Sequence, residues 1–280
     1  MERWATGIFT SVHGGLGAGL EAVKQLQVPT VQLHAPTPEY RTQERTAQLK
    51  EQFAAAELTI TVVFVGFEEE DYSTIEHVQQ TVGLVPRFTR EDRVRQTLEV
   101  ADFAAELGVD AIGMHLGFVP PDRNDPEYDR VVQATRTVCD HCLQNHQFFH
   151  LETGQETADE LLAFIQEVER DNLRVNFDPA NMILYRVGDP LEALDRIGAY
   201  VRSVHCKDAV WTRRPEQPWH EDAPLGSGDV DIEAFLRKLD TLGYHGPLTL
   251  EREYSPDQAG DLAAALQLLV DLRQRILGPA

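Results

Sequence analysis

The sequence predicts a closed α/β barrel of eight βα units, a (β/α)8 barrel, folded as a single domain over residues 1–280. Two observations support this prediction. Eight short runs rich in Val, Ile, Leu and Phe alternate with amphipathic stretches along nearly the whole chain. A length of 280 residues also suits one such barrel. An open doubly wound sheet is the alternative, but the strand count and the lack of GxGxxG spacing after the first strand favour closure.

The elements follow from the periodicity of the apolar residues. Strands are expected over residues 4–10, 30–36, 59–67, 111–117, 147–153, 173–179, 201–207 and 247–253. Apolar residues at three- and four-residue spacing predict helices over residues 20–27, 45–58, 91–108, 128–146, 158–170, 190–200, 232–244 and 261–277. The glycine-rich segment 14–20 has neither phosphate-binding spacing nor a P-loop lysine, so we interpret it as the first βα turn.

Two connections are longer than a barrel needs: residues 68–89 after the third strand and residues 209–230 after the seventh. Every βα connection emerges on the carboxyl-terminal face of a barrel, where long loops commonly act as lids or specificity walls. Trp211 in the second loop is a candidate substrate contact. The same loop offers further stacking surfaces and donors in Arg213, Arg214, Trp219 and His220, although structural or oligomer contacts explain its tryptophans equally well.

Composition excludes several classes of partner. The chain carries 25 Lys+Arg against 46 Asp+Glu, a formal net charge of -21, which opposes binding to nucleic acid and to anionic lipid. No apolar stretch is long enough for a membrane span, and the first residues do not resemble a signal peptide. The three cysteines are too few for a disulfide framework and fit a reducing compartment. We therefore expect a cytoplasmic protein.

Four of the apolar runs end in a residue that can ligate a divalent metal. These residues are Glu152 in FHLETG, Asp178 in VNFDPAN, His205 in SVHCKD and Glu251 in LTLERE. Parallel strands would gather all four at the carboxyl end of the barrel. Three carboxylates and an imidazole around one point repel and desolvate each other unless a cation lies between them. The pattern therefore predicts a metal site formed by all four.

Each of these residues also has a purely structural explanation. Glu152 could cap the helix that follows it, Asp178 precedes a proline and could start a turn, and His205 could be an ordinary strand-end histidine. Their occurrence together at successive strand ends favours the metal site.

Other polar residues are expected near the same rim. His115 on the fourth strand, and Gln32 and His34 on the second, are candidate substrate contacts, although alternation sends half of such side chains outward. Lys207 could polarise a substrate oxygen or form a salt bridge with a barrel carboxylate. Asp208 could orient Lys207 or His205.

Together these motifs resemble the xylose isomerase-like TIM-barrel superfamily, the sugar phosphate isomerase/epimerase family. The resemblance rests on Glu152 at the fifth strand, FDPAN, HCKD, and the GxGxxD…GYxGxLxxE pattern over residues 226–251. It implies one divalent ion per chain, Mn²⁺ first and Mg²⁺, Co²⁺ or Zn²⁺ as alternatives, with Glu152 and Glu251 also transferring protons. It further implies a small-molecule carbohydrate substrate and a possible homo-oligomer, a dimer or tetramer.

The chemistry of such a site is consistent with that resemblance. A hard cation that polarises a ketose carbonyl acidifies the neighbouring C–H and stabilises an enediolate. Two glutamates on opposite faces of the sugar then give epimerisation or aldose–ketose isomerisation. Loss of a hydroxyl from the same enediolate would make the protein a dehydratase or lyase acting on a keto-inositol or keto-glycoside. A non-catalytic carbohydrate-binding barrel is the remaining alternative.

The substrate is less constrained than the reaction. Asn181 lies three residues after Asp178, where many relatives carry histidine; it can hydrogen-bond a hydroxyl but cannot carry a proton, so we expect it to bind substrate. No arginine cluster marks a phosphate site, although Arg213, Arg214 and Arg252 are candidates. An unphosphorylated substrate is preferred.

Overall fold

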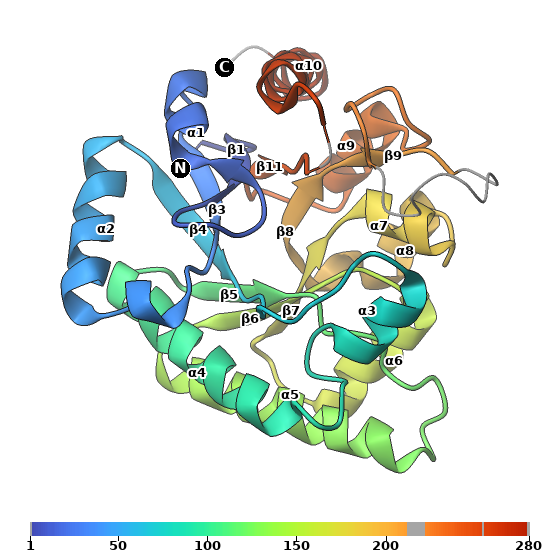
Figure 1. The fold of residues 1–280 in the computed structure, drawn as a ribbon. Coiled ribbons are helices and arrows are strands. Elements are labelled where there is room, and N and C mark those ends of the chain that lie inside the picture. Colours follow the sequence, from blue (N-terminus) through green and yellow to red (C-terminus); the bar gives the residue numbers. More distant parts are fainter. Residues whose placement is uncertain (1, 212–221, 254, 279–280) are drawn as a thin grey trace.

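In the computed structural model, eight parallel strands close into a barrel with helices around its outside (Figure 1). The structure describes residues 2–211, 222–253 and 255–278. The barrel strands are β1 (Thr6–Ser11), β3 (Thr30–His34), β4 (Thr59–Phe64), β5 (Ala111–Met114), β6 (Phe148–Glu152), β7 (Leu173–Phe177), β8 (Val201–Cys206) and β11 (Leu248–Leu250). Pairing of β11 with β1, from Thr6 opposite Leu248 to Ile8 opposite Leu250, closes the ring. The predicted (β/α)8 TIM barrel is confirmed.

Helices surround the strands on every side (Figure 1). They are α1 (Leu20–Leu26), α2 (Gln43–Ala55), α4 (Arg90–Leu107), α5 (Pro126–Gln144), α6 (Ala158–Val168), α8 (Pro190–Ile197), α9 (Ile232–Thr241) and α10 (Gln258–Leu277). Each lies within a predicted helical stretch or overlaps most of it. The segment expected to be helical over 190–200 ends as the 3-10 turn η2 (Gly198–Tyr200). None of the helices in the described ranges is long and apolar enough to cross a membrane.

Two short helices were not expected from the sequence. Helix α3 (Ile75–Thr81) lies inside the connection 68–89, which the sequence indicated only as a loop, and α7 (Pro179–Tyr185) follows β7 directly. Each has seven residues, too few for apolar periodicity to stand out. Both begin at a side-chain cap, Thr74 for α3 and Asp178 for α7.

Minor elements complete the carboxyl-terminal face. They are β2 (Ala18–Gly19), which extends the sheet beside β1, the 3-10 turn η1 (Pro38–Tyr40), and the antiparallel pair β9 (Asp208–Ala209) and β10 (Asp222–Ala223). The pair β9–β10 closes the base of the predicted long loop 209–230. Residues 212–221 lie outside the described part of the chain, and so do the candidates Arg213, Arg214, Trp219 and His220.

The barrel interior is apolar on one side and polar on the other. Phe9, Val62, Phe64 and Ala111, from β1, β4 and β5, form a small buried apolar cluster. The ring of Phe64 packs on Gly113, where an added Cβ would lie 2.8 Å from the ring, so this strand position requires glycine. The other strands place buried polar side chains inside the barrel: Gln32, His150, Asn176, Ser203 and Thr249.

Four of these polar side chains form a hydrogen-bonded floor. Gln32 donates to Asn176 Oδ1 at 3.3 Å, and Ser203 donates to the same oxygen at 2.6 Å. His150 Nδ1 lies 2.9 Å from Ser203 Oγ. Register shifts occur next to both Gln32 and Asn176, where β3 meets β4 and where β7 meets β8. Because side chains alternate along a strand, the residue two positions after His150, Asn176 or Ser203 points into the barrel one layer higher.

Candidate metal centre and substrate cavity

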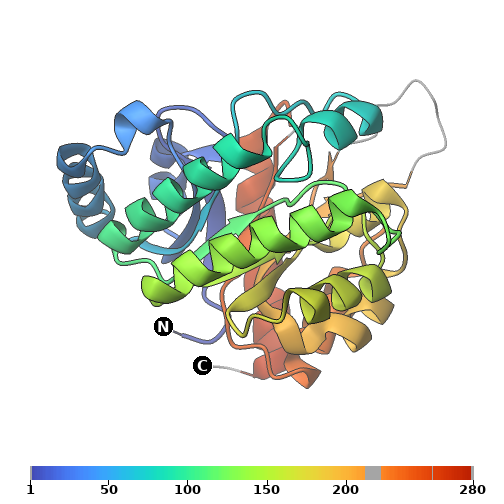
Figure 2. The ribbon, with the colours of Figure 1, turned by 90° about the horizontal axis from the view of Figure 1, so that it is seen from below.

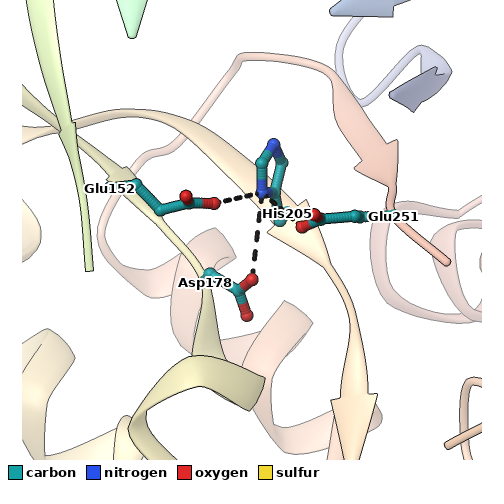
Figure 3. Close-up of side chains that lie close together, drawn as sticks. All are labelled: Glu152, Asp178, His205 and Glu251. Atoms are coloured by element: carbon teal, nitrogen blue, oxygen red, sulfur yellow. Dashed lines mark ion pairs between the residues drawn. The ribbon is translucent and has the colours of Figure 1, made fainter. Parts of the chain in front are cut away.

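The four predicted ligands meet in that higher layer. Glu152 ends β6, Asp178 and Glu251 directly follow β7 and β11, and His205 lies on β8. The ring atom Nδ1 of His205 is 2.6 Å from Glu152 Oε1, 2.8 Å from Glu251 Oε2 and 3.8 Å from Asp178 Oδ2 (Figure 3). One ligand atom from each of the four residues lies within 4.8 Å of all the others. The convergence expected from the strand order is therefore present.

The imidazole of His205 is held in one orientation. Its Nε2 lies 2.6 Å from Oε1 of Gln32, and since the Gln32 amide donates to Asn176, this oxygen must accept the Nε2 proton. In the neutral ring, Nδ1 is then the unprotonated nitrogen, and its lone pair is directed at the three carboxylates. The rings of Phe9 and Phe64 pack against the imidazole at 5.4 and 5.1 Å between centroids. This is the arrangement expected of a metal-ligating histidine.

Asp178 has a structural role as well as its place in the cluster. Its Oδ1 accepts hydrogen bonds from the backbone N–H groups of Ala180 and Asn181 and so caps α7. Its Oδ2 faces His205. Thr153 fixes the backbone here, because its hydroxyl donates to the Asp178 carbonyl at 2.8 Å and accepts from the Asp178 N–H at 2.7 Å. The turn and metal interpretations of Asp178 are thus compatible, with one oxygen serving each.

Glu152 does not cap the helix that follows it. Thr157 is the N-cap of α6 and forms a capping box with Glu160. The Glu152 carboxylate points into the barrel instead (Figure 3).

The cluster has the properties expected of a cation site. Asp178 Oδ2, His205 Nδ1 and Glu251 Oε2 are buried and face one another, and none forms a hydrogen bond with a described group outside the cluster. Burial would lower the pKa of His205, but the charges of Glu251 and Glu152 outweigh it and raise that pKa well above its ordinary value. These carboxylates therefore attract positive charge to the point where Nδ1 is directed. Three carboxylate oxygens and one imidazole nitrogen suit a divalent cation such as Mn²⁺, Mg²⁺, Co²⁺ or Zn²⁺.

The two glutamates of the cluster differ in acidity. Burial raises the pKa of Glu152, and His205 only partly offsets this. Burial acts in the same direction on Glu251, but the charges of Lys207 and His205 outweigh it, so its pKa lies well below the ordinary value. The pair therefore has one carboxyl group that retains a proton readily and one that stays ionised.

A cavity opens above the cluster at the carboxyl-terminal face. It is lined by Leu16, Tyr72, His115, Glu152, Asn181, Leu184, Tyr185, Lys207, Glu251 and Glu253. Among the residues expected to contact substrate, His115, Asn181 and Lys207 therefore face this cavity. No arginine among the described residues lines it.

The other three candidates lie elsewhere. Gln32 is beneath the cluster and contacts His205, so its position is that of a residue that orients a ligand. The ring of His34 lies between Gly15 and Gly66, where an added Cβ would come within 2.6 and 2.5 Å of it. Trp211 is 40 % exposed, and the guanidinium of Arg186 lies over its ring. Substrate contact by these residues stays a prediction.

Aromatic side chains form one wall of the cavity. His115 stacks on Tyr185 with 5.9 Å between ring centroids and lies 6.1 Å from the ring of Tyr72. Gly154 permits this position, because a Cβ there would lie 2.3 Å from His115 Nε2. Burial lowers the pKa of His115 to about 4, so the ring is neutral near pH 7 and can both donate and accept hydrogen bonds.

Lys207 is surrounded by carboxylates. Its Nζ lies 3.4 Å from Glu251, 3.9 Å from Asp178 and 4.0 Å from Glu253. Both roles predicted for Lys207, in the cavity and in ion pairs, are therefore compatible with its position. Glu253 was not identified from the sequence, although its place two residues after Glu251 was a usable signal. Leu16, Tyr72 and Tyr185 come from loops and a short helix and carried no such signal.

Two sequence interpretations are wrong. Asp208 does not orient Lys207 or His205; its carboxylate accepts hydrogen bonds from the backbone N–H groups of Ala209, Gly226, Gly228 and Val230, which shapes the loop after β8. Arg252 is not a phosphate ligand in the cavity. Its side chain forms ion pairs with Asp222 at 2.5 Å and Asp261 at 2.9 Å.

Comparison with known proteins agrees with the fold. The fold and the cluster define an α/β-barrel protein with a candidate metal site at the carboxyl-terminal face of the barrel. Residues 20–272 match the family described as xylose isomerase-like TIM barrel, and the chain belongs to that family. A solved structure of a xylose isomerase domain protein from Planctomyces limnophilus is 48 % identical with a TM-score of 0.95, over 99 % of this chain and 100 % of the other.

Curated relatives match over shorter segments. Inosose dehydratase of Lacticaseibacillus casei is 23 % identical over 52 % of this chain and 54 % of its own length. Ketose 3-epimerase of Arthrobacter globiformis is 29 % identical over 41 % of this chain and 35 % of its own length. The chain thus spans about half, or less, of the length of the curated relatives it matches.

Proposed function

We propose that this protein is a divalent-metal-dependent sugar isomerase or epimerase that acts on a ketose or a related polyol-ketone. The convergence of Glu152, Asp178, His205 and Glu251 below an open cavity carries the proposal. All four would hold the ion. When bound, a divalent cation would polarise the substrate carbonyl and acidify the adjacent C–H.

The protein's own groups would carry the protons. Glu152 and Glu251 come from β6 and from the end of β11 and approach Nδ1 of His205 separately, at 2.6 and 2.8 Å (Figure 3). One carboxylate would remove a proton from the carbon beside the carbonyl, and the other would return one. Return to the opposite face of the same carbon inverts it, and return to the neighbouring carbon moves the carbonyl.

The cavity favours an uncharged sugar. Three carboxyl groups, of Glu152, Glu251 and Glu253, face it against the single ammonium of Lys207 among its lining residues. A phosphate dianion would meet repulsion there and, among the described lining residues, no arginine. His115 and Asn181 offer hydrogen bonds to hydroxyl groups, while Tyr72 and Tyr185 offer ring faces to the sugar.

A dehydratase or lyase is the second candidate, because the similarity to inosose dehydratase covers 52 % of this chain. The first proton transfer would be the same. Loss of a hydroxyl group as water would then replace reprotonation.

Solvent exchange tests the proposal. Metal-stripped protein in deuterated water would be given a panel of unphosphorylated ketoses and inososes, with Mn²⁺, Mg²⁺, Co²⁺ or Zn²⁺ restored in turn. We expect deuterium at one carbon only when an ion is present. Inverted, transposed or dehydrated products distinguish epimerase, isomerase and dehydratase.

Substitutions of Glu152 and Glu251 would test their roles in proton transfer. Glu152→Gln and Glu251→Gln would each reduce exchange by about 10²-fold or more, whereas Glu91→Gln, on an exposed position of α4, would leave it unchanged. A complete lack of exchange over the whole panel, with the ion bound, would contradict the proposal and favour a carbohydrate-binding barrel.

A further inference from the structure

A second and larger cavity lies beside the metal site. It has a volume of about 510 Å³ and is bounded by residues 116–123 after β5, the start of α5 and the first turns of α6. Figure 2 shows α5 and α6 packed side by side along this part of the barrel. The volume lies within the range of small-molecule sites in proteins.

The wall of this cavity is mainly apolar. Its apolar lining residues include Phe118, Val119, Pro121, Tyr128, Leu161 and Phe164. Side chains this apolar at the surface of a single chain commonly mark a ligand or partner site.

The cavity adjoins the cavity at the metal site. Glu152 lines both. Phe118 lines the second cavity and packs edge-on against Tyr185, which lines the first, with 5.8 Å between ring centroids. The two cavities therefore share Glu152 and this aromatic contact in their walls.

Charge restricts what this space accepts. Glu152, Glu156, Asp159 and Glu160 lie around it, and Arg123 is the one cationic side chain among its described lining residues. An anionic group would be repelled. An uncharged apolar ring system fits the apolar wall of the cavity.

We propose that the second cavity binds the aglycone of a glycoside substrate, an uncharged aromatic or alicyclic group attached to the keto-sugar at the metal centre. This inference rests on the proposed function and narrows its substrate to keto-glycosides. The sugar would lie against Tyr185, and the aglycone would lie in the adjoining cavity against Phe118 and Phe164.

Two ligands that differ only in the aglycone test the inference. The affinities of metal-loaded protein for phenyl and methyl 3-keto-β-D-glucoside would be measured by calorimetry. Burial of a phenyl ring predicts at least about tenfold tighter binding of the phenyl compound. Ala163→Trp places a bulky ring in the cavity and should remove this preference. Gln166→Trp, exposed on the same helix, should preserve it.

Three results would bear against aglycone binding in the second cavity. Equal affinities, or a phenyl preference that survives Ala163→Trp in a protein with unchanged thermal unfolding, would overturn the inference. Binding of phenol itself with the same affinity as the phenyl glycoside would also overturn it and indicate a separate effector site. Deuterium exchange on unsubstituted ketoses tests the proposed function separately. If this exchange occurs but the phenyl and methyl glycosides bind equally well, the inference about the second cavity fails and the proposed function stands.

Discussion

Gln32 Oε1 lies 2.6 Å from His205 Nε2, on the edge of the imidazole opposite to the atom that faces Glu152 and Glu251. The two residues are 173 positions apart in the chain, and the register of β3 brings them together. Because this contact fixes which nitrogen carries the proton, Gln32 is expected to control metal affinity without touching the metal.

Gln32→Leu should therefore weaken metal binding by about 10- to 100-fold. The loss would be measured by calorimetric titration of metal-stripped protein with Mn²⁺. Gln147→Leu is the matched control, since Gln147 is also a buried glutamine but donates to the Ala101 and Val109 carbonyls far from the cluster. If both variants bind Mn²⁺ like the wild type, Gln32 has no such role.

Removal of a ligand should separate metal binding from helix capping. Asn can cap a helix as well as Asp, so Asp178→Asn should preserve α7 but lose most of the metal affinity. The control is Asp189→Asn, which makes the same change at the exposed N-cap of α8. At a hundredfold excess over Kd, the ion should stabilise the wild type by about 2.7 kcal/mol. Thermal unfolding with and without Mn²⁺ should show this gain in Asp189→Asn and its loss in Asp178→Asn.

The buried ion pair beside the cavity should matter more than an exposed one. Asp222 is buried, and Arg252 contacts it with a guanidinium that is also largely buried. Arg252→Met would leave that carboxylate without this contact and should lower the free energy of unfolding by about 3–5 kcal/mol. Arg237→Met breaks an exposed pair with Glu233 and should cost about 0.5 kcal/mol or less. Urea unfolding would measure the free energy of unfolding of both variants. Equal losses in Arg252→Met and Arg237→Met would contradict the larger contribution predicted for the buried pair.

Glu70 should make stability depend on pH. Burial raises its pKa to about 7, although the carboxylate accepts the N–H groups of Phe67 and Gly83. The folded state then binds a proton more tightly than the unfolded state, whose ordinary pKa is 4.5. Stability contributed by the protonated group is present below pH 4.5 and is lost as pH rises to about 7.

Glu70→Gln removes this titration. Relative to wild type, the variant should gain about 1–2 kcal/mol in free energy of unfolding between pH 4.5 and pH 8. Urea unfolding at several pH values measures the difference, with Glu68→Gln as an exposed neighbouring control. If the difference in free energy of unfolding between Glu70→Gln and wild type does not change with pH, the raised pKa of Glu70 is contradicted.

Local pattern was enough to identify the four groups of the candidate metal site. Glu152, Asp178, His205 and Glu251 each follow an apolar run, and in a barrel of parallel strands every such run ends at the same face. The same reasoning failed for Asp208, because adjacency in the sequence says little about direction. Its neighbour Lys207 lies in the cavity, while Asp208 binds backbone N–H groups of the loop after β8.

The sequence by itself thus determined the barrel, its closure and the four groups at its mouth, because strand periodicity and strand ends are local properties of the chain. Only the tertiary structure decided what surrounds them. Gln32 beneath His205, Tyr72 and Tyr185 around the cavity, and Phe118 at the second cavity owe their positions to strand register, short helices and loop packing. Those depend on contacts between residues far apart in the chain, which no local pattern encodes.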